Sequence, residues 1–177
     1  GETHHFRIMQ DRDGSVAGIA LFTTIHANYM AFLQYIATRS DLRGRGYGAW
    51  MLRDVIRQVR RDGWRHAGYP YLGVVLEVER PADAADSNES ILRSRRISWY
   101  LRNGARPVKG VDLIAPPVTP GEPAMRYSLL FVPAVWKRMA GARLRRMMVG
   151  SVLISGYGEA PESWYMRHAL GDLSTAR

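Results

Sequence analysis

Cysteine is absent from the 177 residues, and this absence excludes three kinds of chemistry together. Disulfides, thiolate nucleophiles and zinc sites built on thiolates all require that side chain. Long apolar runs are also absent, since the longest, such as residues 16–25, reach about half of the ~20 residues that a membrane helix requires. With no secretory signal ahead of them, we expect a cytoplasmic protein without a membrane span.

Acidic residues are few compared with basic ones. The 16 Asp and Glu face 25 Lys and Arg, which gives a net charge of +9. Such a balance suits nucleic acid, an anionic membrane or an anionic cofactor, and composition alone does not choose among them. The five histidines are scattered except for His4 and His5, so no metal site is predicted and that pair is expected in a solvated N-terminus.

Glycine is concentrated in one short stretch, residues 43–48, with the sequence RGRGYG. Residues 32–38 before it predict a short buried strand. An amphipathic helix is predicted after it, starting near Tyr47 and ending near Asp62–Gly63, with Trp50 on its apolar face and Asp54 on its other face. Glycines at a helix N-terminus expose backbone N–H groups where the dipole favours anions. The stretch therefore predicts a phosphate-binding loop.

Spacing tests which phosphate loop this is. The P-loop string G-x-x-x-x-G-K-[ST] is absent. Gly44, Gly46 and Ala49 match a dinucleotide fingerprint on paper, but a charged stretch, 39–43, separates them from the strand, and no acidic residue ends a second strand about 20 residues on. A plain basic surface turn stays open as a further interpretation.

Two short motifs resemble the GNAT superfamily of acyl-CoA-dependent N-acetyltransferases. Arg43-x-x-Gly46-x-Gly48 matches that family's [QR]-x-x-G-x-[GA] signature, between strand and helix as in the family. Residues 100–105 (YLRNGA) resemble the Y-x-x-x-G-[FA] ending of the family's next helix. The motifs stand in the family's order, about 55 residues apart.

The resemblance implies an α/β (α+β) fold with a mixed, strongly twisted sheet and flanking helices. The order of predicted elements agrees with it: strands at 6–10, 15–24, 32–38, 72–79, about 105–113 and 127–132, a turn at 11–14, a helix from Asp86 or Ser87 to Asn103, and a proline-rich loop at 116–123. The family's usual first strand and two helices are missing, since only five residues precede the predicted hairpin.

Residues 1–132 are predicted to form the cofactor-binding core, and residues 133–177 a helical extension packed on it. The extension carries an apolar face on a basic amphipathic helix, made by Val135, Trp136, Met139, Ala140, Leu144 and Met147. A last short helix is predicted at 163–170. We expect this tail to replace part of the missing N-terminal lid.

The resemblance also assigns roles to residues that hold acetyl-CoA, with no metal involved. The pyrophosphate would lie on the loop, whose members are Arg43, Gly44, Arg45, Gly46, Tyr47 and Gly48. The pantetheine arm would pair with the backbone of Ile36, Ala37 and Thr38, where a backbone N–H could also stabilise the oxyanion. Tyr100 stands where the family places the tyrosine that protonates the thiolate.

Two carboxylates interrupt an otherwise apolar predicted strand. Glu77 and Glu79 lie two residues apart, so their side chains leave the same face. Either could deprotonate an amine, directly or through water, or bind a cationic acceptor, and Glu77 is slightly favoured because it lies deeper in the strand. The other interpretation, that Arg80, Arg95 or Arg96 pairs with them, stays open.

The sequence therefore predicts transfer of an acetyl group from acetyl-CoA to a small amine or a peptide amine. Direct attack in a ternary complex is favoured because no cysteine can carry the acyl group. The alternative is a basic nucleic-acid-binding module without catalysis, although aromatics interleaved with basic residues are sparse. The sequence leaves a homodimer open.

Overall fold

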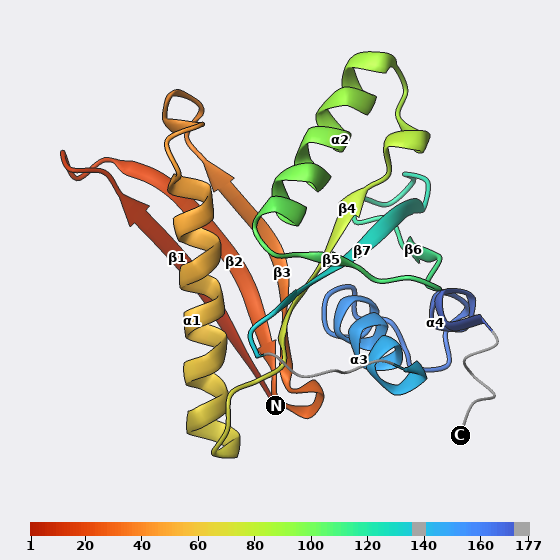
Figure 1. The fold of residues 1–177 in the computed structure, drawn as a ribbon. Coiled ribbons are helices and arrows are strands. Elements are labelled where there is room, and N and C mark those ends of the chain that lie inside the picture. Colours follow the sequence, from red (N-terminus) through yellow and green to blue (C-terminus); the bar gives the residue numbers. More distant parts are fainter. Residues whose placement is uncertain (136–140, 172–177) are drawn as a thin grey trace. The chain divides into compact units, whose positions relative to one another are not determined.

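The protein is described by a computed structural model that covers residues 1–135 and 141–171. In these residues the chain forms seven β-strands and four α-helices (Figure 1). It divides into two compact units. The first comprises Gly1–Val74 and the short stretch after residue 132, and the second comprises Val75–Val132 and the C-terminal helices.

An antiparallel meander of three strands forms the sheet of the first unit: β1 Glu2–Gln10, β2 Val16–Ile25 and β3 Met30–Thr38. The β1–β2 turn is closed by a 2.8 Å hydrogen bond from the Asp11 N–H to the Ser15 carbonyl. Gly14 takes the positive φ of 82° that this turn needs. The predicted hairpin is confirmed.

Strand β1 begins at Glu2, earlier than predicted. Its ladder with β2 starts at the pair Glu2–Ile25, so His4 and His5 lie inside a strand. The His5 ring stacks on Phe22 with 4.5 Å between centroids, and its Nε2 donates to Asp62 Oδ2 over 2.7 Å. The expected solvated N-terminus holds for His4, which is exposed, but not for His5, whose side chain is only 14% exposed.

Helix α1 Tyr47–Ala67 is longer than predicted. Gly63 does not end it but is buried within it, where a Cβ would approach the Tyr71 backbone nitrogen to 2.4 Å. The helix ends instead at Gly68, which has the left-handed conformation typical of a C-cap. The glycine at position 63 therefore serves a close approach of two chain segments.

The sheet of the first unit is covered by α1, which contacts β2 and β3 (Figure 1). The buried apolar side chains of α1 are Met51, Leu52, Val55 and Val59. Two expectations for this helix are wrong. Asp54, expected on the solvent side, is buried and pairs with Arg7 and Arg57. Trp50, expected on the apolar face, is exposed beneath the Arg57 guanidinium.

The second unit combines four strands with three helices. They are β4 Gly73–Glu79, whose first two residues belong to the first unit, α2 Ser87–Arg102, β5 Arg106–Pro107, β6 Leu113–Ala115, β7 Met125–Pro133, α3 Ala142–Leu153 and α4 Trp164–Leu170. Strand β7 lies beside β4 and pairs antiparallel with both β5 and β6. The predicted loop at 116–123 therefore joins β6 and β7 as a hairpin.

The strand predicted at about 105–113 is broken in the structure. Its first part is reduced to β5, and its last residue begins β6. Pro107 has no N–H for a ladder, and Gly110 takes a φ of 73°. These two residues interrupt the strand, and β7 pairs with the two parts separately.

Helix α2 begins as predicted. The side chain of Asp86 accepts the Glu89 N–H over 2.8 Å, and the Glu89 carboxylate accepts the Ala85 N–H over 2.8 Å. Gly104, with a φ of 92°, follows the helix as expected.

The tail helix lies further along the chain than predicted. Val135 is in a bend, the positions 136–140 of the predicted apolar face lie outside the described residues, and α3 begins at Ala142. Its buried apolar residues are Met148, Val149, Val152 and Leu153. The predicted last helix is confirmed as α4, capped by the Ser163 side chain.

Candidate functional site

The loop between β3 and α1 exposes a helix N-terminus without a capping side chain. Gly46 is the N-cap of α1, and no side chain bonds to the first turn there. Gly44 and Gly46 have positive φ values of 77° and 85°, and a Cβ on either would meet no atom within 4 Å. The first N–H groups of a helix have no intrahelical partner. The loop therefore presents open backbone donors, which fits a phosphate group.

Side chains of the β1–β2 turn anchor this loop. Arg39 donates to both oxygens of Asp41, over 2.8 and 3.1 Å, and to Ser15 Oγ over 2.6 Å. The Tyr47 hydroxyl donates to Asp11 Oδ1 over 2.8 Å, which lowers the pKa of that carboxyl. The turn at 11–15, expected only to close a hairpin, therefore also positions the start of α1.

The positive charge and the solvent exposure of the loop are compatible with phosphate binding. Arg43 and Arg45 are exposed, and neither forms an ion pair within the part of the chain that the structure describes. Ile36, Ala37 and Thr38 end β3 next to this loop and are half-buried. The structure thus brings the predicted cofactor residues together in one unit.

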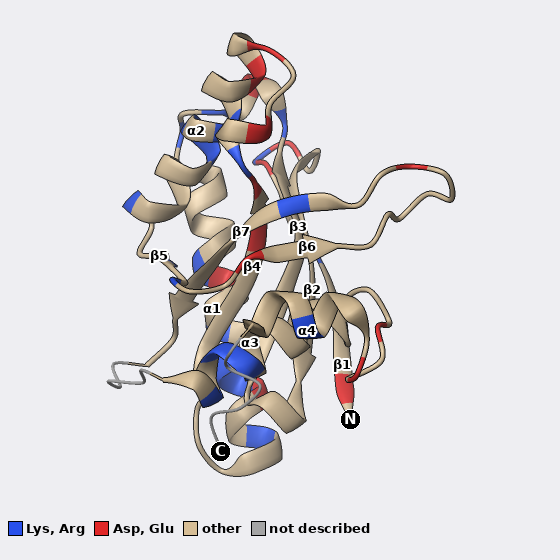
Figure 2. Ribbon diagram, turned by 90° about the vertical axis from the view of Figure 1, so that its right-hand side faces the viewer, with Lys and Arg blue, Asp and Glu red and all other residues tan. Residues whose placement is uncertain are grey.

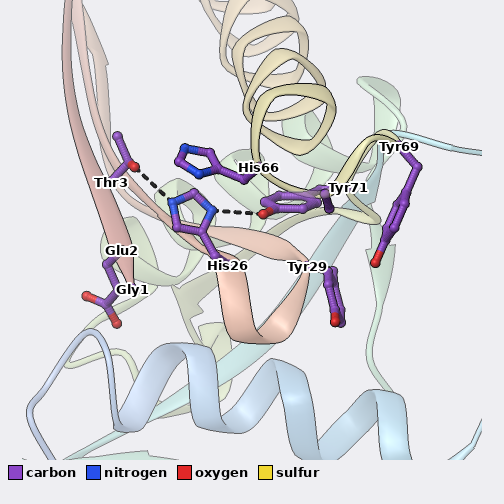
Figure 3. Close-up of a pocket in the computed structure, with 9 residues that line it drawn as sticks. Gly1, Glu2, Thr3, His26, Tyr29, His66, Tyr69 and Tyr71 are labelled. Atoms are coloured by element: carbon purple, nitrogen blue, oxygen red, sulfur yellow. Dashed lines mark hydrogen bonds between the residues drawn. The ribbon is translucent and has the colours of Figure 1, made fainter.

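A hollow of about 730 Å³ lies at the opposite end of α1 (Figure 3). His26 lies at its centre, bonded to Thr3 Oγ1 over 2.9 Å and to the Tyr71 hydroxyl over 2.8 Å. Burial, and then the charge of His66, lowers the pKa of His26. A helix of 21 residues is about 30 Å long, so this hollow is separate from the glycine loop.

Glu77, in the second unit, is a carboxylate of the predicted site with a strongly raised pKa. Burial raises its pKa to about 7, although a hydrogen bond from the Tyr157 hydroxyl acts in the opposite direction. That hydroxyl donates to Oε1. Oε2 is buried and has no hydrogen-bond partner among the described residues. Glu77 therefore has an oxygen available for a proton near neutral pH.

Two tyrosines surround Glu77. Tyr157 comes from the segment after α3, 80 residues along the chain. Tyr127, on β7, has its pKa raised by burial and then by the Glu77 charge. Burial and Glu77 also raise the pKa of Tyr157, so its hydroxyl keeps its proton and remains a donor.

Glu79 is in a different environment, although it leaves the same face of β4. Its Oε2 accepts from Arg96 over 2.6 Å and lies 4.0 Å from Arg93 Nε. The ion pair expected as one interpretation for the two carboxylates therefore forms at Glu79. In the described residues Glu77 has no such arginine partner.

Tyr100 lies near the end of α2, 6% exposed, with its ring edge against Trp99 at 4.8 Å between centroids. Burial raises its pKa to about 12. The phenol therefore remains protonated at any physiological pH.

The glycine loop lies in the first unit, and Glu77, Glu79 and Tyr100 lie in the second. Tyr157 and Tyr127 were missed. No local pattern marks them, since a single tyrosine in a loop or a strand is common, and only the fold brings Tyr157 to Glu77.

A comparison with known families bears on the segment that contains the glycine loop. Residues 2–83 match the model of the acetyltransferase (GNAT) family. This segment is therefore similar to the GNAT acetyltransferases. The resemblance predicted from the first motif is confirmed, and the second motif, at 100–105, lies beyond the matched residues.

Solved structures with a similar fold agree. A Bacteroides thetaiotaomicron protein assigned to the GNAT family is 25% identical, with a TM-score of 0.54 over 72% of this chain and 60% of that one. A GNAT acetyltransferase of Staphylococcus aureus Mu50 is 15% identical, with a TM-score of 0.51 over 75% and 69%. A Bacillus anthracis Ames protein assigned as a streptothricin acetyltransferase, solved with acetyl coenzyme A, is 13% identical, with a TM-score of 0.51 over 73% and 62%.

These findings confirm the predicted GNAT-like α+β fold. This chain spans 60% of the length of the Bacteroides protein. No curated protein sequence gives a significant match. Within the described residues, every helix is too short or too polar to cross a bilayer.

Proposed function

We propose that this chain transfers an acetyl group from acetyl-CoA to a primary amine by direct attack in a ternary complex. The observation that carries the proposal is the uncapped N-terminus of α1, with its two positive-φ glycines, inside the segment that matches the GNAT family. When bound, acetyl-CoA would supply an activated acyl thioester.

The first unit would hold the cofactor. Backbone N–H groups from Gly44 to Gly48 would bind the pyrophosphate, with Arg43 and Arg45 adding charge. The backbone of 36–38 would bind the pantetheine arm. Open space beside Gly44 and Gly46 supports this assignment, because a side chain there would occupy the approach to the backbone.

A residue of the second unit would deprotonate the acceptor amine. Glu77 would take a proton from the ammonium group of the acceptor at Oε2, directly or through a water molecule. A pKa of about 7 makes Glu77 a suitable base at neutral pH. Glu79 is a weaker candidate because it is ion-paired with Arg96. Tyr157 would fix the orientation of the carboxylate through Oε1.

Tyr100 would donate a hydrogen bond to the departing sulfur. Its pKa of about 12 lies above the ~8.5 of a thiol, so complete proton transfer is uphill and the hydrogen bond is the main contribution. The segment 133–177 would act as a cover on the acceptor side, since it supplies Tyr157.

The test is calorimetric titration with acetyl-CoA. Arg43→Ala/Arg45→Ala should weaken binding about tenfold, because two charge-assisted phosphate contacts are lost. Arg60→Ala/Arg61→Ala removes the same charge from the far half of α1 and should change affinity less than twofold. An absence of saturable binding to the wild type would overturn the proposal.

A further inference from the structure

A second hollow, of about 460 Å³, lies wholly within the second unit. The lining residues that matter here are Asp83, Arg93, Met125, Arg126, Trp164 and Tyr165. Its size suits a small organic molecule. The two aromatic rings meet edge to face, 5.2 Å apart, and Trp164 also stacks on His168 at 4.8 Å. These contacts give the hollow a fixed aromatic wall.

Two sets of contacts connect this hollow to the surroundings of Glu77. Arg93 lines the hollow, and its Nε lies 4.0 Å from Glu79, which leaves the same face of β4 as Glu77. Met125 also lines it, and its sulfur accepts the Tyr127 hydroxyl over 3.7 Å. Tyr127 in turn is close enough to Glu77 for that charge to raise its pKa. The hollow and the proposed base are therefore neighbours.

The charged side chains that line the hollow differ in the contacts they already make with other residues. Arg93 is 7% exposed and held by the Arg80 carbonyl over 3.0 Å and by the Glu89 carboxylate. Asp83 lies 3.4 Å from Arg80. Arg126 has a half-exposed side chain, and its one ion pair among the described residues is a long contact, 3.8 Å, with Asp112.

Asp112 does not depend on Arg126, because it also lies 3.0 Å from His168 and 3.5 Å from Arg80. The Arg126 guanidinium is therefore the charge in the hollow with most freedom to bind a ligand. Its planar fork matches a carboxylate through two parallel hydrogen bonds.

We propose that this hollow binds the amine acceptor, and that the acceptor is an amino acid or short peptide whose carboxylate pairs with Arg126 and whose apolar side group packs on Trp164 and Met125. This inference rests on the proposed function and specifies its substrate class. Asp83, already paired with Arg80, is the weaker anchor, so a polycation is not the favoured acceptor.

The experiment compares acceptors that differ only in the carboxylate. Release of free CoA from acetyl-CoA is measured with leucine, phenylalanine and the dipeptide Ala-Phe, each beside its C-terminal amide, and with spermidine. The wild type should prefer each acid over its amide by about tenfold or more in kcat/KM, the effect of one charge-assisted pair.

Variants locate the preference. Arg126→Gln should bring the acid-to-amide ratio close to one, and Arg126→Lys should restore part of it. Arg95→Gln, an exposed arginine of α2, should keep the wild-type ratio. Thermal unfolding of each variant checks that it folds.

Three results would overturn the inference: equal rates for acids and amides, a ratio insensitive to Arg126→Gln, or a preference for spermidine that is lost in Asp83→Asn. Failure of the proposed function is distinguishable, because no acceptor would then release CoA and acetyl-CoA would not stabilise the protein.

Discussion

Asp62 in the first unit and Glu77 in the second both place carboxylate oxygens away from water, but they differ in how many hydrogen bonds those oxygens accept. Asp62 accepts three hydrogen bonds, from His5 over 2.7 Å, Thr24 over 2.8 Å and Gln58 over 2.9 Å, so both oxygens are bonded. Glu77 accepts one, from Tyr157, and Oε2 has no partner among the described residues. Saturation of a buried carboxylate indicates a structural role, and an unsatisfied oxygen indicates a site that can accept a proton.

The largest expected effect is on turnover. Glu77→Gln should lower kcat about 100- to 10,000-fold, because the amide cannot take a proton from the acceptor. The affinity for acetyl-CoA, measured by calorimetry, should stay within about twofold, since the cofactor loop lies in the other unit. Glu79→Gln is the matched comparison on the same strand face and should lose less than about tenfold. Equal losses in both variants would contradict the assignment of the base.

The same variant should change stability in the opposite direction. The folded-state pKa of Glu77, about 7, lies above its unfolded value of about 4.5. The folded state therefore binds the proton more tightly, and stability from this group is lost as pH rises from about 4.5 through 7. Glu77→Gln should raise the thermal midpoint at pH 8 and leave it nearly unchanged at pH 4. A midpoint lowered at pH 8 would show that ionised Glu77 stabilises the fold.

A substitution at Asp62 should show the reverse pattern, with a lower free energy of unfolding and an unchanged turnover. Asp62→Asn should lower the free energy of unfolding by about 2 kcal/mol, because the new NH₂ group faces donors that then lack an acceptor. Urea unfolding measures the change, and Glu122→Gln in the exposed loop at 116–123 should shift it by less than about 0.5 kcal/mol. If Asp62→Asn lost turnover at unchanged stability, the contrast between the two carboxylates would fail.

Local sequence was sufficient for features that depend on adjacent residues. The glycine loop, the Asp86 cap of α2 and the β1–β2 turn were predictable because each is fixed by residues within a few positions of one another. Gly63 was wrongly predicted to end the helix. A glycine is needed there because the backbone of Tyr71 packs against it, and this contact forms only after the chain has turned back. The continuation of α1 beyond Gly63, to Ala67, could not be deduced from propensity alone.

Features that depend on distant residues were not predictable. The contact between Tyr157 and Glu77 spans 80 positions, and that between His5 and Asp62 spans 57. The sequence marked Glu77 as unusual because it interrupts an apolar strand, but separated it from Glu79 only by its deeper position in that strand. The arginine at Glu79 and the tyrosine at Glu77 made that separation, and both come from elements that only the fold brings to β4.

The smallest expected effect comes from a variant that widens the difference between the two carboxylates. Tyr157→Phe takes away the only hydrogen bond to Glu77 within the described residues, and that bond lowers the pKa of Glu77. The pKa should therefore rise, and the acidic limb of kcat/KM against pH should move upward by roughly one unit, since a hydrogen bond to a charge contributes about 1.5 kcal/mol. Activity should fall severalfold at pH 7 and recover near pH 9. Tyr35→Phe, on an exposed face of β3, should leave the profile unchanged. A uniform loss at every pH would mean that Tyr157 supports folding and does not tune the base.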